Sequence, residues 1–234
     1  MLVTLATRTF TPEPTAAALR LGALARALAA GGDRVRVLTS RLAPSVARDA
    51  HESGENDERT EESHGLVNVR RAPVLRDRTG AVRGYVSYMS FDLPLLARLL
   101  TGPRPDVVVS EPPPTTGAAV RIACAARRVP YVYYCADIVS DAAALAGVPS
   151  IVVRTVAGLE SFALRGARRV IAVSDGVARR ARDLGARDVA VVPNGVRVPD
   201  AVATGTPEGF PTCDGPVFVY AGTVAQWLAP EVFV

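Results

Sequence analysis

The alternation of short apolar segments with longer helical patterns constrains the fold of this chain more than any other feature. The candidate strands are Leu2–Ala6, Val35–Thr39, Leu66–Arg70, Asp106–Val109, Tyr131–Cys135, Val170–Val173 and Val189–Val192. Most of them are apolar throughout, which is typical of strands that a parallel sheet buries on both faces. Repeated β-α-β units therefore predict an α/β fold with a Rossmann-like doubly wound parallel sheet.

Helix boundaries are marked by capping residues. The predicted helices are 15–30, which Thr15 caps and Gly31-Gly32 ends, 115–127, which Thr115 or Thr116 caps, 150–166 and 174–185. Pro94 leaves 84–100 open between one kinked helix and a turn followed by a shorter helix.

The pattern also suggests how the chain divides into domains. We expect one large domain over 1–199, in which the polar and acidic segment 41–65 forms a mobile loop. The stretch 200–216 is rich in proline and glycine and is predicted to be a linker. A new strand pattern starts at 217, but 217–234 is too short to bury a core. We expect it to be the truncated start of a second domain.

Composition excludes several kinds of chemistry. Every basic residue other than histidine is arginine, so this chain offers no P-loop lysine and no lysine Schiff base for pyridoxal phosphate. The loop after the first strand contains no glycine, which argues against a dinucleotide fingerprint for NAD or FAD. The three cysteines show no CxxC motif and no pairing with histidine. We therefore expect no metal and no cofactor.

Charge and hydropathy give expectations about location. The net charge is +4, and arginines cluster at Arg165, Arg168, Arg169, Arg179, Arg180, Arg182 and Arg187. This cluster fits either peripheral association with an anionic membrane or a set of solvated helix faces, and the sequence leaves both open. No nucleic-acid motif is present. No apolar run reaches the ~18 residues of a membrane-spanning helix, and no signal peptide is evident, so we expect a cytoplasmic protein, with the inner face of the membrane left open.

Several segments together carry a resemblance to a known family. They are Pro105–Pro113 (PDVVVSEPP), Val129–Tyr133 (VPYVY), Ala167–Ser174 (ARRVIAVS), Val192–Val196 (VPNGV) and Tyr220–Thr223 (YAGT). Each motif is weak alone, but their order along the chain resembles that of family 4 glycosyltransferases, most closely those that build bacterial surface polysaccharides.

The resemblance implies a GT-B architecture, in which two Rossmann-like domains face each other across a cleft. The N-terminal domain would receive a saccharide or lipid-linked acceptor, and the C-terminal domain would hold a nucleotide-sugar donor. It also implies transfer with retention of configuration and without a metal. The family's paired glutamates belong to the second domain, so the isolated chain is expected to be inactive.

The first helix of the chain is the candidate site for the donor phosphate. Ligands of doubly wound sheets bind beyond the carboxyl ends of the strands, where free helix N–H groups can hold a phosphate. Glu13, Thr15, Ala16, Ala17 and Arg20 lie in this first loop and helix. The family usually has a glycine pair here, and the side chains of Thr15–Ala17 restrict the approach of a ligand to the backbone.

Four further residues are predicted at strand ends. Asp137 is the candidate catalytic residue, because its carboxylate could orient an acceptor hydroxyl or stabilise positive charge on a sugar ring. Glu111 could bind a sugar hydroxyl. Ser174 and Asn194 are also assigned to the cleft, although a helix cap is the simpler explanation for Ser174 and a tight turn for Asn194.

The leading hypothesis is therefore the N-terminal part of a retaining glycosyltransferase. A stand-alone binding module for a phosphorylated ligand or a partner domain is the alternative. A GT-B sugar epimerase or phosphorylase is a third interpretation, on fold grounds alone.

Overall fold

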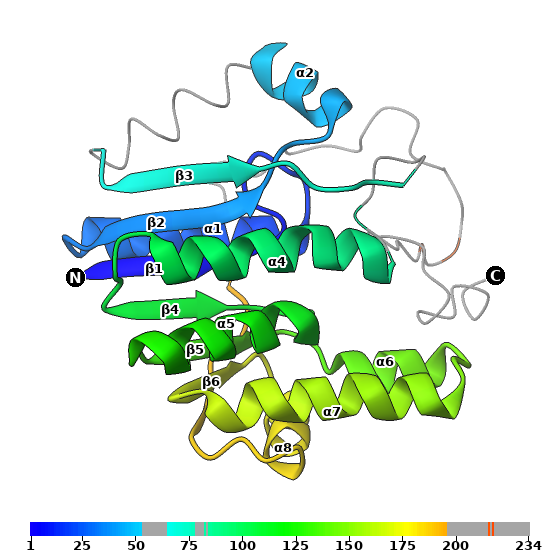
Figure 1. Ribbon diagram of the computed structural model, residues 1–234. Coiled ribbons are helices and arrows are strands. Elements are labelled where there is room, and N and C mark those ends of the chain that lie inside the picture. Colours follow the sequence, from blue (N-terminus) through cyan, green and yellow to red (C-terminus); the bar gives the residue numbers. More distant parts are fainter. Residues whose placement is uncertain (53–64, 78–81, 83, 196–214, 216, 218–234) are drawn as a thin grey trace. The chain divides into compact units, whose positions relative to one another are not determined.

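The computed structural model of the protein describes residues 1–52, 65–77, 82, 84–195, 215 and 217 (Figure 1). The chain divides into two compact units, Met1–Pro193 and Asn194–Val234. The first unit contains every strand and helix of the described residues.

One parallel sheet of seven strands forms the centre of the first unit. Its order is β3-β2-β1-β4-β5-β6-β7, and every neighbouring pair is parallel. The strands are β1 (Leu2–Ala6), β2 (Arg34–Ser40), β3 (Val67–Ala72), β4 (Val107–Ser110), β5 (Tyr131–Cys135), β6 (Arg169–Ala172) and β7 (Val189–Val191). From β1 the chain builds outward through β2 and β3, then returns to the other side of β1 with β4. The predicted doubly wound sheet is confirmed, with its switch point between β1 and β4.

Helices cover both faces of the sheet (Figure 1). Helix α1 (Ala16–Ala30) packs on one face, where Leu21 and Ala25 meet Val3, Leu5 and the β2 valines. On the opposite face lie α4 (Tyr85–Thr101), α5 (Pro114–Arg127) and α7 (Ser150–Gly166), which bury the larger core cluster against β4, β5 and β6. The remaining helices are α2 (Pro44–Glu52), α6 (Val139–Leu145) and α8 (Asp175–Asp183).

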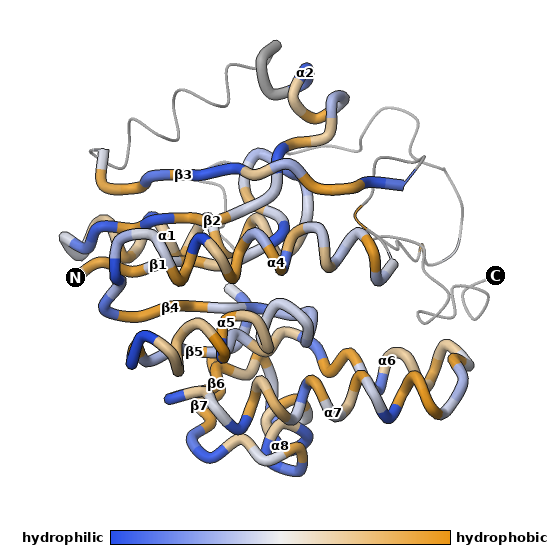
Figure 2. Tube along the Cα trace, in the orientation of Figure 1, coloured by the Kyte–Doolittle hydropathy of each residue, from blue (hydrophilic) through white to orange (hydrophobic). Residues whose placement is uncertain are grey.

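Hydropathy follows position in the sheet (Figure 2). The central strands β1 and β4 are apolar and buried, whereas the edge strand β3 is mainly hydrophilic, with Asn68 and Arg70 exposed. An edge strand with charged side chains resists pairing with another chain.

A glycine sets the spacing between α5, β5 and α7. A Cβ atom on Gly117 would lie 2.6 Å from Tyr133 Cε2 and 2.8 Å from the Cβ of Ala163. Both neighbours are fully buried. Only a residue without a side chain allows this close approach.

Most predicted boundaries agree with the structure, two local expectations need correction, and the alternative left open at Pro94 is resolved. Helix α5 begins at Pro114, so Thr115 and Thr116 lie inside the helix and do not cap it. Proline suits this first position because its φ is already helical and it needs no N–H partner there. Helix α4 continues through Pro94 as one helix. Part of the predicted loop 41–65 is helical, as α2, and 53–64 lie outside the described residues.

Helix α6 was not predicted, because seven residues carry little periodic signal. The predicted linker 200–216 and the segment 217–234 lie outside the described residues, apart from Gly215 and Val217.

Candidate functional site

A cleft of about 610 Å³ opens at the carboxyl edge of the sheet. It lies beyond β1, β4 and β5, which meet at the switch point, and the first turns of α1, α2 and α4 complete its walls. Of the predicted site residues, the structure brings Glu13, Thr15, Ala17, Arg20, Glu111 and Asp137 together around it. Parallel topology alone produces this arrangement, because all carboxyl strand ends meet at one edge.

Glu111 forms the floor of the cleft directly after β4. It is 5% exposed, and its Oε1 lies 2.5 Å from the hydroxyl of Thr7, which follows β1. Burial raises the pKa of Glu111 to about 7, against the opposing effects of Thr7, Arg20 and Arg8. A carboxylate in water would titrate near its ordinary value of 4.5, so Glu111 is about half protonated at neutral pH.

The Thr7 hydroxyl has two acceptors within reach. It lies 2.5 Å from Glu111 Oε1 and 2.8 Å from the carbonyl oxygen of Thr9. A hydroxyl has a single hydrogen. Donation to Glu111 favours the ionised carboxylate, so burial raises the Glu111 pKa against this hydrogen bond.

The β1–α1 loop is held by its own side chains. Thr15 caps α1, since its Oγ1 accepts from the N–H of Ala18 at 3.1 Å, as predicted from the sequence. Glu13 accepts from the N–H of Phe10 at 3.0 Å and lies 3.6 Å from Arg76 Nη2. Burial raises the pKa of Glu13. Glu13 therefore shapes the loop, and Thr15 satisfies one of the first-turn N–H groups of α1.

Asp137 stands at the other wall, after β5, and its side chain is exposed to the cleft. Its position depends on Glu160, a fully buried carboxylate of α7. Glu160 accepts from the N–H of Val139 at 2.8 Å and from the N–H and hydroxyl of Ser140 at 3.2 and 2.6 Å. These bonds tie the start of α6 to α7 and so fix the loop that carries Asp137.

Two arginines face the same cleft. Arg20 lies with its guanidinium 5.9 Å from the Tyr134 ring centroid, and it acts on Glu111 through its charge. Arg8, which was not predicted as a site residue, stacks on Tyr88 of α4 at 3.8 Å and is 7% exposed. The position of Arg8 directly after β1 is the one sequence signal that could have indicated it.

Three predicted residues take other positions. Ser174 is exposed and caps α8 by accepting from the N–H of Val177 at 3.3 Å, and it does not line the cleft. Ala16 begins α1 but does not line the cleft. Asn194 belongs to the second unit.

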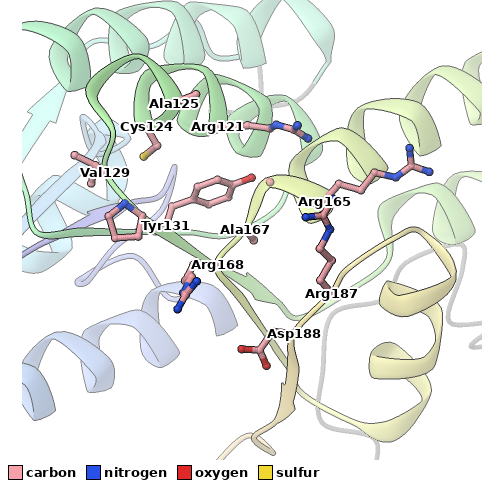
Figure 3. A pocket seen from close by; sticks show the side chains of 12 residues that line it. Arg121, Cys124, Ala125, Val129, Tyr131, Arg165, Ala167, Arg168, Arg187 and Asp188 are labelled. Carbon is pink, nitrogen blue, oxygen red and sulfur yellow. The ribbon is translucent and has the colours of Figure 1, made fainter.

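A second cavity, of about 670 Å³, opens at the opposite edge of the sheet near the start of β5 and β6. It contains four arginines, but the side chain of Arg168 points away from that of Arg165 (Figure 3). Arg121 is engaged by the Phe162 ring, 4.0 Å away, and by the Phe162 carbonyl. Because these cations do not converge, the cleft at the carboxyl edge is the better candidate site.

Within the part of the chain that the structure describes, no group of three or more histidine, cysteine, aspartate or glutamate residues could hold a metal ion. No helix of these residues has both the length and the apolar character needed to span a membrane.

Comparison with known proteins agrees with this geometry. The fold and the cleft define a Rossmann-like α/β domain of the kind found in GT-B glycosyltransferases. A family model described as "Glycosyl transferase 4-like domain" matches residues 15–195, and the chain belongs to that family. No curated protein matches the sequence.

Solved structures support the fold. Sucrose-phosphate synthase from Thermosynechococcus elongatus superposes with a TM-score of 0.57 at 15% identity, covering 83% of this chain and 48% of that one. UGT89C1 from Arabidopsis thaliana, complexed with UDP-L-rhamnose, has a TM-score of 0.54 at 12% identity, covering 88% of this chain and 55% of that one. HepE from Anabaena, in complex with UDP, has a TM-score of 0.51 at 19% identity, covering 83% of this chain and 44% of that one. The present chain thus spans about half the length of these proteins.

Proposed function

We propose that this chain is the acceptor-side domain of a retaining glycosyltransferase. The whole enzyme would move a sugar from a nucleotide-diphosphate donor to a saccharide or lipid-linked acceptor in cell-surface glycan biosynthesis. The observation that carries this proposal is the cleft at the switch point, where Asp137, Glu111 and the start of α1 converge in a chain of the glycosyl transferase 4-like family. UDP or a UDP-sugar is present in two of the similar structures, which supports a nucleotide-sugar as donor.

The residues suggest a division of labour. The exposed carboxylate of Asp137 would orient an acceptor hydroxyl or stabilise positive charge on the sugar ring. Glu111, when protonated, would donate a hydrogen bond to a sugar hydroxyl. The N–H groups at the start of α1, beside Thr15 and Ala17, would hold the donor phosphate with the help of the helix dipole and Arg20. We infer that no metal takes part.

Binding measurements test this proposal. The melting temperature of the chain, and of any longer product of the same gene, is measured with increasing UDP-, GDP- and dTDP-sugars. A rise that depends on concentration requires preferential binding to the folded state. We expect one donor class to produce it, with Asp137→Asn reducing the effect of an acceptor added next. Ser174→Ala, outside the cleft, serves as the control.

Two other outcomes have clear meanings. A rise for the isolated chain that equals the rise for the longer product would favour a stand-alone binding module. The absence of any rise, in either protein and for all three donor classes, would contradict the proposal.

We also propose that the enzyme works in the cytoplasm at the inner face of the membrane. Among the late arginines, Arg169 pairs with Asp188 and Arg180 with Asp141, whereas Arg165 is exposed. Exposed arginines attract anionic lipid. Co-sedimentation with vesicles of anionic lipid at low salt, and release at high salt, are expected; equal sedimentation with neutral vesicles would contradict an electrostatic contact.

A further inference from the structure

Arg8 is an unusual charged residue of the cleft, because two of its guanidinium nitrogens are buried without a hydrogen-bond partner. It lines the cleft, yet it is only 7% exposed. Its Nε and Nη2 atoms are buried and have no hydrogen-bond partner within the described structure. Buried guanidinium donors are normally paired, since leaving them unpaired costs free energy.

The carboxyl groups around Arg8 act on it without forming an ion pair. Asp92 on α4 is 2% exposed, and its Oδ1 accepts from the Thr116 hydroxyl at 2.6 Å, while its Oδ2 is buried without a partner. No ion pair among the described residues includes Arg8. Burial lowers the pKa of Arg8, against the opposing effects of Asp92, Tyr88 and Glu111.

Both the backbone and the guanidinium of Arg8 are held in place. The Ser40 hydroxyl at the end of β2 donates to the Arg8 carbonyl oxygen at 2.7 Å, and the Tyr88 ring of α4 lies 3.8 Å below the guanidinium carbon. A stack on an aromatic ring fixes the orientation of a guanidinium but leaves its hydrogen-bond donors in its own plane. Arg8 is thus a preorganised cation at the base of a cleft.

We propose that Arg8 recognises a phosphoryl or carboxylate group of the acceptor. This inference rests on the proposed function and adds the chemical class of the acceptor, an anionic saccharide. Arg8 is anchored to β2 and α4, whereas the residues assigned to the donor phosphate, Thr15 and Ala17, lie on α1. A planar guanidinium pairs with two oxygens of such a group at once, and their negative charge makes these hydrogen bonds stronger than those to the hydroxyls of a neutral sugar.

Sulfate is the probe that tests the inference, because it keeps its charge between pH 6 and pH 9 and carries no sugar. Binding of sulfate to the wild-type chain is measured by calorimetry and by the NMR signal of the Arg Nε–H groups. We expect Arg8→Gln to weaken sulfate binding at least about tenfold. Arg154→Gln, an exposed arginine of α7, is the matched control and is expected to leave binding unchanged.

A competition experiment separates the acceptor from the donor. UDP at saturation should leave sulfate binding intact if Arg8 serves the acceptor, and should displace sulfate if Arg8 serves the donor diphosphate. Displacement would overturn the assignment to the acceptor. Failure of both the chain and the longer product of the gene to bind any nucleotide would refute the proposed function, while the effect of Arg8→Gln on sulfate would still decide the anion site.

A folding defect in Arg8→Gln would not end the test. Arg8→Lys keeps the charge but loses the two-pronged donor, so it should retain sulfate binding at reduced affinity. In the wild-type protein, the NMR signal of one Arg Nε–H group should shift with added sulfate. The spectrum of Arg8→Lys should lack this signal. Unchanged sulfate affinity in both variants, or wild-type Nε–H signals that do not respond to sulfate, would show that Arg8 is a structural residue.

Discussion

Replacement of Glu111 by glutamine should make the stability of the fold less sensitive to pH. Burial holds the pKa of Glu111 at about 7, compared with an ordinary value of 4.5. A raised carboxyl pKa means that the native state binds the proton more tightly than the unfolded chain does. The corresponding stabilisation is complete below about pH 4.5 and is lost as pH rises through 7.

The magnitude follows from the shift in pKa. Each unit is equivalent to 1.36 kcal/mol, so the difference between the two values is worth about 3 kcal/mol. Glutamine resembles the protonated carboxyl group, because its amide can donate to Thr7, and it does not titrate. The free energies of unfolding of wild type and Glu111→Gln should therefore be similar at pH 5, and the variant should be about 3 kcal/mol more stable at pH 9.

Urea unfolding followed by far-ultraviolet circular dichroism, at intervals from pH 5 to pH 9, provides the measurement. The difference between the two proteins is the useful quantity, because Glu13 and Asp92 titrate in both. Asp188→Asn serves as a control, since Asp188 is exposed and its pairing with Arg169 should contribute little. A difference that stays constant over this pH range would refute the assignment of a buried, protonated carboxyl group at Glu111.

Three further predictions concern stability and binding. Glu160→Ala leaves three buried donors of the α6 start unpaired, and should lower the free energy of unfolding by about 3 kcal/mol in urea; a loss below about 1 kcal/mol would contradict its role. Gly117→Ala should lower the free energy of unfolding by about 1 to 3 kcal/mol, because its new Cβ would crowd buried neighbours. Gly158→Ala, whose new Cβ meets nothing within 4 Å, should leave this free energy unchanged or raise it. Calorimetry measures both variants. Each of the variants Thr15→Ala and Ser174→Ala removes a helix cap and should lower the free energy of unfolding by about 1 kcal/mol. Only Thr15→Ala should weaken the binding of a nucleotide-sugar, measured by titration.

Strands and helices could be predicted from the sequence because their patterns depend on residues that are close together in the chain. The apolar runs of β1 and β5 gave their bounds without error, and Thr15 and Ser174 marked the helices that they cap. Helix α6 escaped prediction because it is short, and a distant carboxylate, Glu160, also helps to fix its first turn. Local signals cannot report a cap that comes from another helix.

For the candidate site, the sequence by itself determined which loops would meet, since parallel β-α-β units bring every carboxyl strand end to one edge. It also determined that Asp137 and Glu111 would lie there. Only the tertiary structure decided that Glu111 is buried with a raised pKa, that Arg8 is buried in the cleft with two nitrogens unpaired, and that Ser174 lies outside it. Burial and charge balance depend on every neighbour in three dimensions, and those neighbours come from segments far apart in the chain.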